Sequence, residues 1–200
     1  MGQRLVVTIK QDKKDICKIY YHWSAYTMSA LYQTQEIVGC IYNGKDETKE
    51  DLLLRLIRFC ENSGGGIDGS GDEFNYIASL YPNEKFKEDG YSRSDGLIAL
   101  SENGMGELQG WSEGDVIIDI YEDLIEFGVC GWYENLLEYN ESRAEWDEDY
   151  VNGIPLKDVP DIGYDFCHIA IEDLADVVAE METVDGYVVR NGHEVFEMIA

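Results

Sequence analysis

Acidic side chains recur at helical spacing in the segment Glu134–Asp149, ENLLEYNESRAEWDED. Five glutamates follow one another at steps of four, three, four and three residues, which places them on one face of an α-helix. With two aspartates they make seven acids in sixteen residues. The acids are Glu134, Glu138, Glu141, Glu145, Asp147, Glu148 and Asp149. The pattern predicts a surface that attracts Lys and Arg side chains of a partner.

The spacing of these carboxylates is close to that of nucleic-acid phosphates. A helix rises about 1.5 Å per residue, so the segment carries one carboxylate per ~3.4 Å. A single DNA strand carries one phosphate per about 3.4 Å. Any Glu-rich helix comes near this value, and a solvated outer face is the alternative interpretation. Like charges four residues apart destabilise an isolated helix by roughly 0.2–0.5 kcal/mol, and only Arg143 lies within the segment to relieve them.

A second acidic stripe is predicted near the C-terminus. Glu172, Asp176 and Glu180 are spaced four residues apart, on a helix expected over residues 171–181. Its inward face is predicted from the apolar residues Ile171, Leu174, Ala175, Val178 and Met181. Together the two stripes are the predicted partner-binding residues.

The negative charge is unevenly distributed along the chain. The 200 residues carry a net charge of −26. Residues 1–100 contain 12 Lys/Arg and 15 Asp/Glu, whereas residues 101–200 contain 3 and 26. Such asymmetry indicates an interaction surface. A field this negative repels nucleic acid and anionic membranes and attracts basic proteins, so we expect no direct nucleic-acid or membrane binding.

Catalytic motifs are missing from the sequence. It has three histidines, and it lacks GxSxG, HExxH and any Cys/His pair at a telling spacing. With 41 acids, paired carboxylates arise by number alone and cannot identify a glycosidase. Asp68, Ser70 and Asp72 resemble the start of a calcium loop, but Ser79 stands where that pattern needs Glu. We therefore predict a non-enzymatic protein without cofactor or metal.

Five cysteines occur without a CxxC motif: Cys17, Cys40, Cys60, Cys130 and Cys167. Their odd number and apolar neighbours predict buried free thiols in a reducing compartment. The sequence shows no signal-peptide pattern at its start, and no apolar run approaches the ~20 residues of a membrane helix. The expected location is therefore the cytoplasm.

Local patterns predict an α+β fold in which an antiparallel sheet and hairpins pack with several helices. A hairpin is expected over residues 4–23, and helices over 24–42, 47–61 and 72–80, the second capped by Asp46. The Gly-rich run Ser63–Asp72 predicts a flexible loop. Residues 96–121 predict a further hairpin, and residues 187–199 another around Asn191-Gly192.

The domain organisation follows the charge. Residues 1–95 form a near-neutral α+β part and residues 96–200 a strongly acidic α+β part, unless the two make one continuous domain. The neutral part is expected to supply much of the core. The sequence leaves the oligomeric state open.

The size, the free cysteines, the aromatic-rich core and the stripes at 134–149 and 172–180 resemble those of acidic inhibitors from phages and mobile elements. These include DNA-mimic anti-restriction and anti-CRISPR proteins. The resemblance is one of type and rests on no diagnostic motif. It implies action in the host bacterial cytoplasm. The partner would be a basic nucleic-acid-binding protein such as a Cas nuclease or a restriction enzyme, whose DNA-binding channel the inhibitor would block.

Two other interpretations stay open at this point. The chain could be a phage accessory or structural protein without inhibitory role, which would assemble through apolar patches. It could also be a carboxylate-based hydrolase, which is less favoured because the sequence has no clustered nucleophile.

Overall fold

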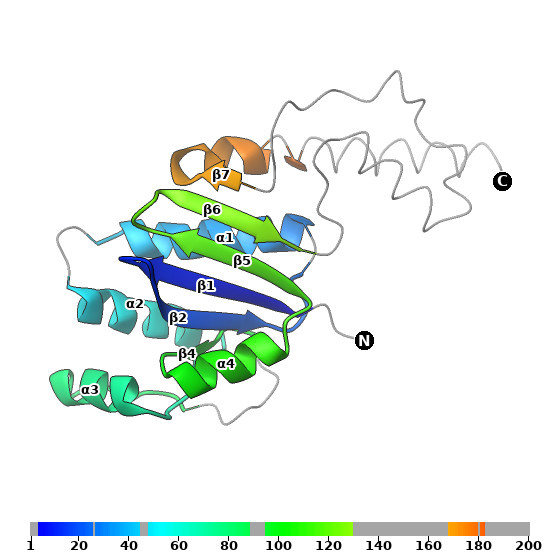
Figure 1. The fold of residues 1–200 in the computed structure, drawn as a ribbon. Coiled ribbons are helices and arrows are strands. Elements are labelled where there is room, and N and C mark those ends of the chain that lie inside the picture. Colours follow the sequence, from blue (N-terminus) through cyan, green and yellow to red (C-terminus); the bar gives the residue numbers. More distant parts are fainter. Residues whose placement is uncertain are drawn as a thin grey trace, which may run out of the picture.

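The computed structural model describes residues 4–25, 27–44, 48–88, 95–129, 168–179 and 181–182. Within them, seven strands form one sheet in the order β3-β4-β2-β1-β5-β6-β7 (Figure 1). Two predicted features lie outside the described residues: the acidic segment at 134–149 and the hairpin at 187–199.

The predicted N-terminal hairpin is confirmed. β1 (Leu5–Gln11) and β2 (Lys14–Tyr21) pair antiparallel, joined by Asp12 and Lys13. Both turn residues have positive φ, 52° and 64°, as a two-residue hairpin turn of this hand requires.

The α+β class is also confirmed, but the sheet is mixed rather than antiparallel throughout. β1 pairs parallel with β5 (Gly114–Asp119), and β3 (Gly66–Ile67) pairs parallel with β4 (Leu97–Ala99). β4 pairs antiparallel with β2, and β6 (Leu124–Gly128) pairs antiparallel with both β5 and β7 (His168–Ala170). Strands from both sides of residue 95 therefore share the sheet.

The first two predicted helices are present, with shifted starts. α1 spans Thr27–Tyr42 and α2 spans Lys49–Asn62. The cap of α2 is Thr48, not Asp46, because the Thr48 side chain accepts a hydrogen bond from the backbone N–H of Asp51. The Asp51 carboxylate in turn accepts from the backbone N–H of Thr48, completing a capping box.

For the middle of the chain, one prediction is only partly right and another is wrong. The expected flexible loop Ser63–Asp72 contains β3, and the backbone N–H of the buried Asp68 donates to the carbonyl of Ile98 at 2.8 Å. The expected hairpin at 96–121 is instead β4, then α4 (Glu102–Gly110), then β5. Ser101 caps α4 by accepting from Gly104 N–H, which turns the chain into a helix after only three strand residues. The helix α3 spans Asp72–Leu80 as predicted.

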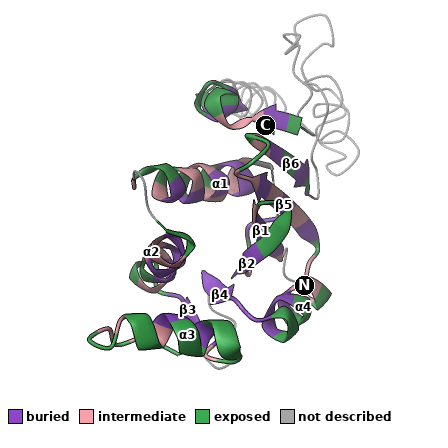
Figure 2. Ribbon diagram, turned by 60° about the vertical axis from the view of Figure 1, so that its left-hand side comes forward, coloured by how far each residue is buried: buried purple, intermediate pink, exposed green. Residues whose placement is uncertain are grey.

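The sheet is covered on both faces. α1 and α2 pack against the face that carries Leu5, Val7 and Ile9, while α4 covers Val6 and Tyr20 on the other face. Buried residues concentrate on the sides of the helices that meet the sheet (Figure 2).

After β7 the chain forms η3 (Ile171–Asp173) and is helical over 174–179 and at 181–182. Leu174, Val178 and Met181 are buried as predicted, whereas Ala175 is exposed and Val177 takes the inward position instead. Positions 174, 177, 178 and 181 form the stripe that a docked helix needs.

Three of the five cysteines lie in the described residues, and all three are free thiols: Cys17, Cys40 and Cys60. Burial raises the pKa of the Cys17 and Cys60 thiols well above the usual value, so both remain neutral. No helix in the described ranges combines the length and the apolar character needed to cross a membrane.

Candidate acidic interface

The predicted partner-binding residues divide into two groups. Glu172 and Asp176 are described and are exposed. The others lie outside the described residues: Glu134, Glu138, Glu141, Glu145, Asp147, Glu148, Asp149 and Glu180. The structure thus places two of the predicted carboxylates, and it shows which further acids lie beside them.

The turn between β5 and β6 supplies the first of these neighbours. Asp119 ends β5, and its Oδ1 accepts hydrogen bonds from the backbone N–H groups of Tyr121 and Glu122, at 3.0 and 3.1 Å. These bonds fix a tight turn in which Asp123 adopts a φ of 54°. The Glu122 and Asp123 side chains are exposed there, and Glu126 is exposed on β6.

The C-terminal helical segment lies directly beside this turn. The backbone N–H of Ile171 donates to the carbonyl of Asp123 at 3.0 Å, and His168 pairs with Glu126 in the β6–β7 register. Glu172 and Asp173 therefore follow immediately on the residue that contacts the turn. Figure 1 shows this segment next to the β7 edge of the sheet.

We call the resulting surface the acidic edge. All of its members are exposed except Asp119, which is half-buried. It comprises Asp119, Glu122, Asp123, Glu126, Glu172, Asp173, Asp176 and Glu182.

Two tyrosines of α1 tie this surface to the rest of the fold. The Tyr42 hydroxyl donates to Asp123 Oδ1 at 3.0 Å, and the Tyr32 hydroxyl donates to Glu182 Oε1 at 2.7 Å. Burial, together with the bond to Asp123, raises the pKa of Tyr42 to about 12. The phenol therefore stays a donor at neutral pH and supports the carboxylate without neutralising it.

The two segments that carry the acidic edge contain no Lys or Arg. Residues 119–129 and 168–182 contain nine Asp/Glu and no Lys or Arg. In the described part of the chain, no ion pair joins any acidic-edge carboxylate to a Lys or Arg. Lys10, which pairs with Asp119 in the β1–β5 register, marks the boundary of the surface. Within the described residues, Lys and Arg therefore leave these carboxylates unpaired.

Exposed aromatic rings accompany the carboxylates. Tyr121 is 64% exposed and Tyr42 48%. Tyr121 lies within the β5–β6 turn, and Tyr42 reaches that turn from α1. Tyrosine is enriched among residues that dominate binding energy, because its ring buries area while its hydroxyl stays paired. Carboxylates interleaved with tyrosines thus suit a protein partner better than a free metal ion. In the described ranges, no group of three or more His, Cys, Asp or Glu residues could hold a metal.

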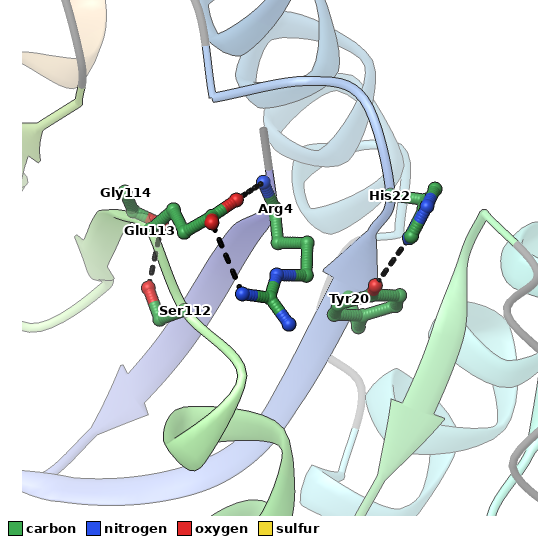
Figure 3. Close-up of polar contacts among 6 residues, drawn as sticks. All are labelled: Arg4, Tyr20, His22, Ser112, Glu113 and Gly114. Atoms are coloured by element: carbon green, nitrogen blue, oxygen red, sulfur yellow. Dashed lines mark hydrogen bonds and ion pairs between the residues drawn. The ribbon is translucent and has the colours of Figure 1, made fainter. Parts of the chain in front are cut away.

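The opposite end of the same strands is charge-paired. Arg4 Nη2 and Glu113 Oε1 lie 3.0 Å apart, and the backbone N–H of Arg4 donates to Glu113 Oε2 at 3.1 Å (Figure 3). Beside them the Tyr20 hydroxyl lies 2.7 Å from His22 Nδ1. The Arg4 guanidinium holds the pKa of the Glu113 carboxyl below its usual value. At this end, the Arg4–Glu113 contacts therefore join the start of β1 to the start of β5.

Six acidic-edge residues were not singled out from sequence: Asp119, Glu122, Asp123, Glu126, Asp173 and Glu182. The signal for Glu126 was the alternation in LIEFG, where Ile125 and Phe127 are buried and Glu126 is exposed. The predicted hairpin ended at residue 121, so it did not include β6.

No family model matches the chain, and neither curated proteins nor solved structures gave a match.

Proposed function

We propose that this protein is an acidic inhibitor that binds the basic nucleic-acid-binding surface of a host defence nuclease and blocks DNA binding. The nuclease would be of the CRISPR effector or restriction type. The observation that carries the proposal is the acidic edge, eight described carboxylates without a Lys or Arg ion pair on a packed sheet edge.

The physical argument is one of competition. A nucleic-acid channel presents Lys and Arg side chains that meet phosphates, and an acidic protein surface offers the same cations an alternative set of anions. Long-range attraction to a chain of net charge −26 accelerates the encounter. Burial of exposed tyrosines such as Tyr121 then slows dissociation.

The acidic edge lies on elements that are packed into the core. Its strands carry the buried residues Ile125, Phe127 and Ile169, and its helical segment carries the buried residues Leu174, Val177 and Val178. A surface that needs no reordering on binding loses less entropy than a disordered acidic tail. This packing distinguishes the proposed inhibitor from an acidic tail that binds many basic proteins weakly.

The test compares two variants with the same change in net charge. The acidic-edge variant carries Glu122→Lys, Glu126→Lys and Asp176→Lys, and the control variant carries Glu36→Lys, Glu88→Lys and Glu107→Lys. All six positions are exposed. Immobilised wild type, acidic-edge variant and control are used to capture proteins from a bacterial lysate at low and high salt.

We expect wild type and control to retain the same nucleic-acid-binding protein, with capture weakening as salt rises. The acidic-edge variant should bind it at least about tenfold more weakly, a loss of ~1.4 kcal/mol. A parallel variant with Glu138, Glu141, Glu145 and Glu148 changed to Lys tests the predicted stripe in the same way. Equal retention by all variants would refute the proposal, and self-association without a basic partner would favour an accessory or structural role.

A further inference from the structure

We draw no further inference here: the strongest candidate, the surface patch after β2 where the exposed Trp23 packs perpendicular to the His22 ring, is an unpartnered apolar surface, and nothing in the structure shows what covers it.

Discussion

The two ends of the parallel pair β1–β5 carry charge in opposite ways. At the start of both strands, the Arg4 and Glu113 side chains form an ion pair. The backbone N–H of Arg4 donates a hydrogen bond to the same carboxylate. At the finish, Asp119 leads into a turn of exposed acids that has tyrosine partners but no described ion pair to Lys or Arg. The first arrangement joins two strands. The second leaves negative charge exposed beside a buried apolar layer, and we expect folding to depend on that layer more than on the carboxylates.

The largest expected effect is the difference in stability cost between changing a buried apolar residue of β6 and changing an exposed acid beside it. Ile125 is fully buried, so Ile125→Ala should lower the free energy of unfolding by about 2–5 kcal/mol through lost burial and a residual cavity. Its neighbour Glu126 is exposed, and Glu126→Lys should change it by no more than about 0.5 kcal/mol. Urea denaturation measures both. A Glu126→Lys cost approaching that of Ile125→Ala would show that the acids support the fold.

An intermediate effect is expected at the paired end. A Cβ added at Gly114 would lie 2.9 Å from the Ala25 Cβ and 3.2 Å from the Val129 Cα. Neither atom belongs to a flexible side-chain tip, so Gly114→Ala should destabilise the fold by about 1–3 kcal/mol. Gly128→Ala on β6 is the control, since the nearest contact of its added Cβ would be an ordinary 3.8 Å to the Asp115 carbonyl oxygen. Equal denaturation midpoints for the two variants would contradict the close approach.

The smallest effect concerns pH and the Arg4–Glu113 pair. The hydrogen bond from Arg4 lowers the pKa of Glu113 from its usual 4.5. A carboxyl with a depressed folded-state pKa stabilises the fold above its unfolded value, and that contribution is lost as pH falls through the folded value. Glu113→Gln should therefore lose less stability than wild type on acidification below pH 4.5. Denaturation curves at several acidic pH values measure this difference, and parallel pH profiles would show that the pair adds nothing.

Sequence patterns predicted the parts of the fold that depend on local periodicity. The hairpin of β1 and β2, the helices α1, α2 and α3, and the inward positions Leu174, Val178 and Met181 all follow from apolar spacing. The Gly-rich run is not a loop throughout, because β3 forms within it by pairing with β4 and bridging to Glu88, contacts that no local pattern encodes. Gly65 illustrates this point. A Cβ added there would lie 2.2 Å from the Gly96 carbonyl oxygen, so glycine is needed because the two backbone segments pack closely.

The candidate site was only partly predictable for a related reason. Glu172 and Asp176 stood out because they repeat at helical spacing on one segment. Glu122 and Asp123 come from a turn about fifty residues earlier, and the bond between Ile171 N–H and the Asp123 carbonyl brings the two segments together. Spacing along a sequence reveals a stripe on one element, whereas a surface built from two elements requires the sheet topology.

Displacement of DNA tests the central claim most directly. A short fluorescent duplex is bound to the purified nucleic-acid-binding protein captured by the wild type, and each variant is titrated in while anisotropy is followed. We predict that wild type and the Glu36/Glu88/Glu107 control release the duplex at equal concentrations. The Glu122/Glu126/Asp176 variant should need at least about tenfold more. Release by that variant as readily as by wild type, or a duplex that stays bound in the presence of wild type, would contradict the account.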